Sequence, residues 1–196
     1  MQFLIVLGNT DPLVWRRIEV PETYSFWDLH VAIQDAMGWL DCHLHEFRVL
    51  HPERGQVDRI GIPDQEFLDE QPSKPGWEVP ISDYFGLRAK LGTPPALYVY
   101  DFGDDWLHLV MFEDLFRAEK SVTYPRCVAG ARACPPEDCG GVYGYADFLL
   151  AIADPKHPEH AEIVEWSGGA YDPDAFDPTQ VVFDDPRKRW KRAFQE

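Results

Sequence analysis

The spacing of apolar residues changes from strand-like to helix-like and back within the first fifty positions. Gln2–Leu7 is almost continuously apolar, and Val14–Val20 carries β-branched and aromatic residues after an Asn-Thr-Asp-Pro turn, so both predict strands. A helix-capping sequence begins at Ser25, and Gly38 can end the helix that follows. Leu44–Leu50 predicts a further strand. The apolar residues of the helical stretch recur every three or four positions: Phe26, Leu29, Ile33, Ala36, Met37 and Leu40.

A β-hairpin is the clearest element of the second half of the chain. Ala96–Phe102 and Trp106–Phe112 both fit strands, and they flank a tight Gly-Asp-Asp connection. Residues 51–80 are rich in Pro, Gly and charge and predict an irregular excursion, whereas Ile81–Leu91 fits a short helix. A loop rich in Cys, Pro and Gly is expected over Cys127–Gly144. Two short helices are expected after it, at Tyr145–Ala153 and Pro158–Trp166.

The order strand, strand, helix, strand predicts an α+β fold. We expect a β-grasp-like mixed sheet with one long packed helix, because a helix laid across one face of a sheet buries its apolar stripe. The length predicts a single domain over residues 1–196. Within it, residues 1–124 would form the sheet-and-helix core, and residues 125–196 the Cys-rich loop and a helical part packed on that core.

Composition indicates a folded protein without a membrane partner. Hydrophobic residues make up 45% of the 196 residues and aromatic residues 14%, which is enough for a substantial core. No apolar run reaches the roughly 18–20 residues of a membrane span. The apolar start of the chain lacks the basic leader and cleavage site of a signal peptide, so we expect a cytoplasmic protein.

The negative charge of the chain is unevenly distributed, which restricts its partners. The formal net charge is −16, yet five of the 18 Lys and Arg residues lie within residues 187–196. The rest of the chain holds 13 basic against 33 acidic residues, and this balance disfavours binding to the phosphates of duplex nucleic acid. Nucleic acid is expected only through the basic tail, and we favour instead a last turn that folds back onto the acidic body.

Cysteines and histidines form the first candidate site. Cys127, Cys134 and Cys139 cluster in the Pro- and Gly-rich loop, and Cys42 precedes His43. Disulfides are not expected in the cytoplasm, so the cluster indicates either buried thiols or a structural zinc site. The spacing lacks the paired C-x2-C of strong zinc motifs, which favours buried thiols. In the zinc alternative a histidine completes the four ligands, and the candidates are His43, His45 and His108.

Three carboxylates and a histidine at the tip of the hairpin form the second candidate site. Asp101, Asp104, Asp105 and His108 could bind a divalent cation or act as acid and base. Aspartates are also ordinary turn residues, because their side chains accept hydrogen bonds from nearby backbone amides. We favour this second interpretation, in which Asp101 and Asp104 bond to the turn and His108 packs beside Trp106.

Several strings along the chain together resemble one known family. They are Asp28-Leu29-His30, Ala36-Met37-Gly38-Trp39, His43-Leu44-His45-Glu46-Phe47, the string Tyr100-Asp101-Phe102-Gly103-Asp104-x-Trp106-x-His108, and Ala133-Cys134-Pro135-Pro136-Glu137-Asp138. Over nearly its whole length the chain resembles the Ri-plasmid open-reading-frame-3-like family, found on plasmids and as passenger proteins of insertion sequences. The resemblance implies an α+β fold and no established reaction.

Two departures from the family pattern affect the candidate sites. Relatives often carry Glu at the position of Leu107, which weakens an acidic role there, and Val at the position of Cys139, which counts against Cys139 as a metal ligand. The resemblance therefore leaves Cys127 and Cys134, with His43, His45 or His108, as the preferred zinc set.

We expect a non-enzymatic protein of mobile-element origin that binds or scaffolds a protein or peptide partner. Its Cys127–Gly141 loop would pack against the hairpin, with or without zinc. The alternative is a metal-dependent hydrolase or nuclease-like enzyme that uses Asp101, Asp104, Asp105 and His108. The sequence does not indicate an oligomeric state.

Overall fold

The computed structural model describes residues 1–63, 73–86, 94–169 and 171–195, which form a mixed sheet of eight strands with four α-helices. The α+β class predicted from the sequence is therefore confirmed. The strands are β1 (Gln2–Leu7), β2 (Trp15–Glu19), β3 (His45–Leu50), β4 (Val57–Gly61), β5 (Lys74–Pro75), β6 (Ala96–Tyr100), β7 (Trp106–Asp114) and β8 (Arg126–Ala131). The helices are α1 (Phe26–Met37), α2 (Gly141–Ala153), α3 (His160–Trp166) and α4 (Pro186–Phe194), with 3-10 turns η1 (Gly76–Glu78), η2 (Ile81–Asp83) and η4 (Pro178–Gln180).

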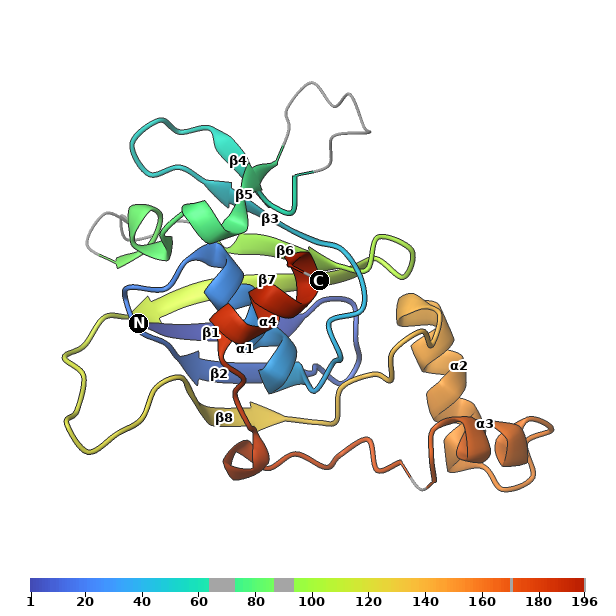
Figure 1. The fold of residues 1–196 in the computed structure, drawn as a ribbon. Helices are drawn as coiled ribbons and strands as arrows, with labels where there is room; N and C mark the ends of the chain where they lie inside the picture. Colours follow the sequence, from blue (N-terminus) through green and yellow to red (C-terminus); the bar gives the residue numbers. More distant parts are fainter. Residues whose placement is uncertain (64–72, 87–93, 170, 196) are drawn as a thin grey trace.

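The sheet has the order β5-β4-β3-β6-β7-β1-β2-β8, and each neighbouring pair is antiparallel except β4 and β5. Side chains alternate across it, so that Phe3, Ile5 and Leu7 of β1 are fully buried. Helix α1 lies across the face of the sheet that is turned to the viewer in Figure 1, and α4 lies beside it. The apolar side of α1 and this face of the sheet form the core.

Local sequence signals determine both ends of α1. The Ser25 side chain accepts a hydrogen bond from the Asp28 amide, and the Asp28 carboxylate accepts one from the Ser25 amide, as the capping box predicts. Gly38 ends the helix in the left-handed conformation at φ +93°, which a residue without Cβ adopts at little cost. The predicted hairpin is also present as β6 and β7.

The region after residue 124 differs from the predicted loop. Arg126–Ala131 forms β8, which pairs with β2 and adds an edge strand to the sheet. Its sequence is weakly strand-like, and pairing with β2 stabilises it. Close packing explains Gly130, because a Cβ there would meet the Phe176 ring at 2.3 Å. Helix α2 begins at Gly141, four residues earlier than predicted.

The predicted irregular excursion contains two short strands, β4 and β5. Of the helix predicted over Ile81–Leu91, the structure has a single 3-10 turn at Ile81–Asp83, and residues 87–91 lie outside the described residues. None of the helices in the described ranges combines the length and apolar character needed to span a membrane.

The basic C-terminal segment folds back onto the acidic body, as predicted. Helix α4 packs on α1, and the Trp27 indole donates a hydrogen bond of 2.9 Å to the Pro186 carbonyl. The Arg189 guanidinium forms a 2.7 Å ion pair with Asp35 of α1. The end of the chain therefore covers the first helix and contributes to the surface described next (Figure 1).

Candidate functional site

A groove of about 520 Å³ lies where α1 and α4 begin. Three tryptophans and two prolines supply most of its apolar surface: Trp27, Trp77, Trp190, Pro80 and Pro186. The aromatic rings support one another through Phe194, whose ring centroid lies 5.2 Å from that of Trp77 and 5.5 Å from that of Trp27. The groove is therefore a preformed aromatic surface between the first and last helices of the chain.

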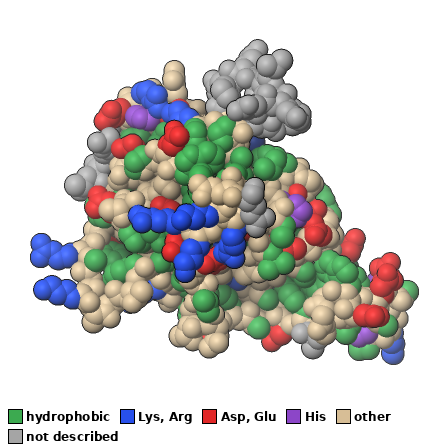
Figure 2. All heavy atoms as spheres, in the orientation of Figure 1, with side chains coloured by type: hydrophobic (Ala, Val, Ile, Leu, Met, Phe, Trp, Pro, Cys, Tyr) green, Lys and Arg blue, Asp and Glu red, His purple; other side chains and the backbone are tan. Residues whose placement is uncertain are grey.

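The two rims of the groove differ in charge. Arg187 and Lys191 of α4 are exposed on one rim and form no ion pair within the described part of the chain. Figure 2 shows Lys and Arg side chains gathered over α4 on this face. On the opposite rim, the Asp28 carboxylate accepts a hydrogen bond from the Ser25 amide at the helix cap, and Glu78 is exposed. The groove thus combines an aromatic floor with one unpaired basic wall.

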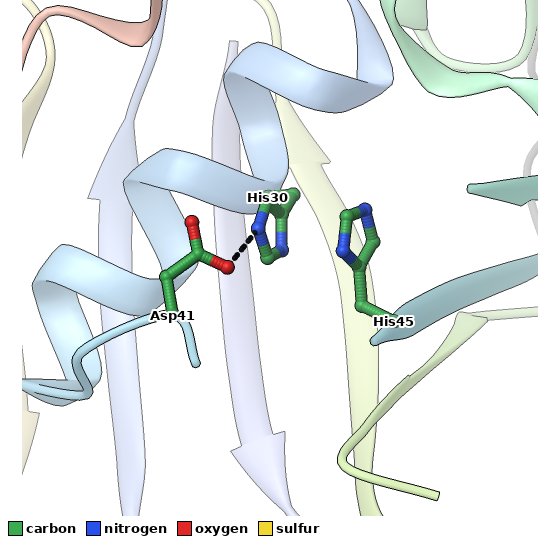
Figure 3. A group of neighbouring side chains, drawn as sticks. All are labelled: His30, Asp41 and His45. Carbon is green, nitrogen blue, oxygen red and sulfur yellow. Dashed lines mark hydrogen bonds and ion pairs between the residues drawn. The ribbon is translucent and has the colours of Figure 1, made fainter. Parts of the chain in front are cut away.

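A buried histidine pair lies behind the floor of the groove. The His30 ring of α1 and the His45 ring of β3 stack with centroids 3.4 Å apart and an angle of 8° between their planes. Trp27, which lines the groove, packs against both rings. Its ring centroid lies 5.1 Å from that of His30 and 5.9 Å from that of His45. Figure 3 shows the two rings with Asp41 on the far side of His30.

Hydrogen bonds fix the orientation of His30. Its Nε2 lies 2.8 Å from Asp41 Oδ1, and its Nδ1 lies 2.8 Å from the Tyr98 hydroxyl. The Gln34 amide donates to that hydroxyl, so the Tyr98 O–H is left to donate to His30 Nδ1 and His30 Nε2–H donates to Asp41. Burial lowers the pKa of both His30 and His45 and raises the pKa of Asp41 to about 6. The pair is therefore neutral in the folded protein.

The geometry of this triad does not suit a metal ion, although its ligand atoms lie within 4.8 Å of one another. An imidazole binds a metal through a lone pair in the plane of its ring, at about 2.1 Å. Because the rings of His30 and His45 are stacked in nearly parallel planes, one ion cannot lie close to both planes. The triad is instead a buried polar contact between α1, β3 and the loop that joins them.

Arg189 connects this triad to α4. Its Nη2 lies 2.7 Å from Asp35 Oδ1, and its Nη1 lies 3.7 Å from Asp41 Oδ2. The same guanidinium lies 3.3 Å from Asp184. Three carboxylates thus hold one cation of α4, and this cluster fixes the basic wall of the groove in place.

A second cluster of a histidine and carboxylates surrounds His43, on the side of the loop before β3 that faces away from His30. His43 Nε2 lies 3.1 Å from Asp138 Oδ1, 3.7 Å from Asp101 Oδ2 and 4.0 Å from Glu137 Oε2. His43 and His45, predicted to share a face of one strand, belong to separate groups, because β3 begins only at His45. The structure brings together His43 of one predicted set and Asp101 of the other.

The remaining predicted zinc ligands are members of neither cluster. Neither group of three metal-type ligands found among the described residues contains a cysteine or His108. The Cys127 thiol donates to the Ala129 carbonyl at 3.4 Å, and burial raises the pKa of Cys127, Cys134 and Cys139, the last to about 12. His108 is fully buried, with Nδ1 3.0 Å from the Trp106 carbonyl.

The aspartates of the hairpin bond mainly to backbone. Asp101 Oδ1 accepts a 2.9 Å hydrogen bond from the Gly103 amide, and Asp104 Oδ2 accepts one of 3.1 Å from the Gly140 amide. Asp105 adopts a left-handed conformation at φ +55°, and its amide bonds to the Asp101 carbonyl. The Asp104 contact attaches the Cys-rich loop to the hairpin. The Asp101 contact is the one that the turn interpretation predicts, whereas the Asp104 carboxylate bonds to the Cys-rich loop and not to the turn.

Sequence reasoning did not select His30, Asp41, the groove tryptophans or Arg189. For His30, the sequence does contain an indication. His30 and Gln34 lie four residues apart on α1, within its otherwise apolar buried side. Two polar residues at that spacing on a buried helix face indicate a hydrogen-bonded partner on the sheet, which is Tyr98.

Comparisons with known proteins extend over nearly the whole chain. A family model described as plasmid pRiA4b ORF-3-like protein matches residues 1–180. The uncharacterized protein y4hQ of Sinorhizobium fredii (strain NBRC 101917 / NGR234) is 35% identical over 195 residues, covering 96% of this chain and 92% of that protein. The crystal structure of the protein of unknown function MM3350 from Methanosarcina mazei Go1 is similar at a TM-score of 0.84 and 42% identity, covering 93% of this chain and 97% of that one.

Proposed function

The chain belongs to the plasmid pRiA4b ORF-3-like family, and for this member we propose a non-enzymatic binding function in which the groove between α1 and α4 holds a peptide segment of a protein partner. The observation that carries this proposal is the combination of three groove tryptophans with two unpaired cations, Arg187 and Lys191. Tryptophan and arginine are the residues most enriched at binding hot spots, and a preformed surface reduces the entropy lost on binding.

The charge of the rim indicates the chemistry of the partner. Arg187 and Lys191 are four residues apart on α4, so both reach the same side of the helix. A peptide with an apolar side chain beside a carboxylate would place the first against the tryptophans and the second between the two cations. A long polyanion fits less well, because the whole chain carries a net charge of −16.

The proposal extends to the type of sheet, the place where the protein acts and a structural metal ion. We propose that the sheet is β-grasp-like in its role as a scaffold for α1, and that the protein acts in the cytoplasm as a passenger of plasmids or insertion sequences. We also propose a structural zinc ion bound by Cys127 and Cys134 with His43, His45 or His108, and loss of bound zinc in a Cys134→Ser variant would support it. The hydrolase alternative has less support, because Asp104 and His108 bond to backbone groups.

Selection from a phage library of random peptides on the immobilised full-length protein tests the binding function. We expect enriched peptides that combine an apolar residue with a nearby Asp, Glu or terminal carboxylate. The affinity of a synthetic copy is then measured by calorimetry for the wild type and for the charge reversal R187E/K191E. We expect this reversal to weaken binding at least about tenfold, since two charge-assisted contacts are lost.

Lys188→Glu is the matched control, because Lys188 is an exposed cation of the same helix that does not line the groove. We expect its affinity to stay within about twofold of the wild type. The proposal fails if no peptide is enriched, or if R187E/K191E and Lys188→Glu bind the peptide equally well. Saturable binding of a single-stranded oligonucleotide that R187E/K191E abolishes, without peptide binding, would assign the groove to nucleic acid instead.

A further inference from the structure

We propose that His43, Asp101, Glu137 and Asp138 bind a divalent first-row transition-metal ion, independently of the groove. The four side chains come from three separate segments: the loop before β3, the start of the hairpin turn and the Pro-rich loop before α2. The ligand atoms of His43, Asp101 and Asp138 all lie within 4.8 Å of one another, with the two carboxylate oxygens at 3.7 and 3.1 Å from His43 Nε2. Glu137 borders this group, with its Oε2 at 4.0 Å from His43 Nε2.

Hydrogen bonds hold two of the carboxylates in position, and in each of them the oxygen nearest His43 is not the one that accepts from a backbone amide. Asp101 is 8% exposed, and its Oδ1 accepts from the Gly103 amide while Oδ2 is the atom nearest His43. Glu137 Oε1 accepts from the Leu40 amide at 2.7 Å while its Oε2 is nearest His43. The Tyr100 hydroxyl donates to the same carboxylate. Contacts of this kind orient ligands around a metal ion.

The histidine supplies an independent indication of a ligand. The His43 side chain is 29% exposed, but its Nε2 atom is inaccessible and has no hydrogen-bond partner, since its 3.1 Å approach to Asp138 lacks hydrogen-bond alignment. A buried polar atom without a partner is unusual and costs free energy. A metal ion between the imidazole and the carboxylates would satisfy this atom.

Charge also favours a cation at this cluster. Asp101, Glu137 and Asp138 place three carboxylates around one imidazole, and no Lys or Arg in the described part of the chain pairs with any of them. A divalent ion would neutralise most of this local charge. One imidazole with carboxylate oxygens suits Mn²⁺ or Zn²⁺, whereas a thiolate-rich set would select zinc more strongly.

The ligand set differs from the one predicted from the sequence. It keeps His43 from the predicted zinc set and Asp101 from the predicted carboxylate set, and it adds Glu137 and Asp138. The two predicted sets have only His108 in common. The fold brings one member of each to the same place.

Titration of the full-length, chelator-treated and thiol-reduced protein with Mn²⁺, followed by the EPR signal of free Mn²⁺, tests the site. We expect about one equivalent to bind. Asp138→Asn and His43→Ala should each weaken the affinity at least about tenfold, because each removes a ligand. Asp105→Asn is the matched control, since Asp105 and Asp138 are both exposed aspartates with φ near +55°, and we expect it to bind like the wild type.

A Cys134→Ser variant separates this site from the predicted thiol site. If it retains Mn²⁺ and Zn²⁺ while Asp138→Asn loses both, the proposal stands. The proposal is overturned if the wild type shows no saturable binding, if Asp138→Asn binds as well as Asp105→Asn, or if Cys134→Ser alone removes the bound metal. Circular dichroism of the Asp138→Asn variant checks that it is folded, which separates a loss of binding from a loss of structure. None of these outcomes affects peptide binding at the groove.

Discussion

Two clusters of the same residue types lie on opposite sides of the loop that joins α1 to β3, and they differ in what they can do. On the inner side, His30, Asp41 and His45 are packed beneath Trp27 with their rings stacked. On the outer side, His43 faces carboxylates of two other segments. The distance between ligand atoms is similar in both clusters, so distance alone does not distinguish them. The orientation of the rings and the burial of the side chains distinguish the two clusters.

The surroundings of each cluster complete the contrast. The inner cluster already contains a cation, because Arg189 lies 3.7 Å from Asp41, and its hydrogen bonds extend to Tyr98. The outer cluster has carboxylates without such a cation in the described residues. A buried imidazole nitrogen without a hydrogen bond occurs in both clusters, His45 Nδ1 in the inner one and His43 Nε2 in the outer one, so the counter-charge and not this nitrogen separates them. A histidine and an aspartate side by side therefore indicate a stabilising contact when they are enclosed and already paired, and a binding site when they converge without a counter-charge.

The largest loss of stability is expected when a side chain of the inner cluster is truncated. His30→Ala removes the stacked ring and leaves the Tyr98 hydroxyl and the Asp41 carboxylate without their partner. We expect the free energy of unfolding to fall by about 3 kcal/mol in a urea titration at pH 7.5. His43→Ala in metal-free buffer should lower it by no more than about 0.5 kcal/mol. Equal losses for the two variants would remove the distinction between the clusters.

A smaller loss is expected from the contact between the inner cluster and α4. Arg189→Ala leaves Asp35, which is mostly buried, without its ion pair, and we expect a loss of about 2 kcal/mol together with faster amide exchange in α4. Arg192→Ala removes a cation that is 64% exposed and should cost less than about 0.5 kcal/mol. If amide exchange in α4 is unchanged in Arg189→Ala, the inner cluster does not hold the basic wall of the groove.

Elements with local signals could be predicted from the sequence. The capping box at Ser25, the glycine at position 38 and the hairpin each depend on residues within a few positions of one another, and all three are present. Strand β8 could not be predicted in this way, because its sequence has low strand propensity and its stability comes from pairing with β2, more than a hundred residues earlier.

The cluster of His43 and Asp101 was only partly predictable for the same reason. His43 and Asp101 were selected from their residue types, and the turn contact of Asp101 was expected from its position beside Gly103. Their convergence depends on β3 and β6 pairing in the observed register, with His45 opposite Tyr100. Position along the chain gives no measure of this distance, so the sequence does not pair His43 with Asp101.

The titrating groups of the inner cluster make the stability of the protein depend on pH. Burial lowers the pKa of His30 and His45, so below the unfolded value of 6.5 the unfolded state binds more protons and stability falls as the pH falls. Each histidine contributes a slope of up to about 1.4 kcal/mol per pH unit. Asp41 acts in the opposite direction, because its pKa is raised to about 6 from 3.8: its contribution is complete below pH 3.8 and is lost as the pH rises through 6.

Urea titrations between pH 7.5 and 5 measure these contributions separately. His45→Phe keeps a stacked ring without a titrating group, and it should reduce the slope by up to about 1.4 kcal/mol per pH unit. Asp41→Asn should make the slope steeper, because the opposing carboxyl is absent. A slope that neither variant alters would show that the inner cluster does not titrate on unfolding in this range.

The smallest effect is expected where the Cys-rich loop attaches to the hairpin. Asp104→Ala removes the acceptor for the Gly140 amide, an exposed contact, so we expect a loss of only about 0.5–1 kcal/mol in the free energy of unfolding. The Gly140 amide should exchange faster in hydrogen-exchange NMR, while amides of α1 beside His30 should not change. Because Glu137 and Asp138 lie on this loop, the variant should also weaken Mn²⁺ binding slightly and leave peptide binding unchanged. Faster exchange in α1 would mean that the two sides of the loop are energetically coupled, and the inner and outer clusters would then have to be treated as one unit.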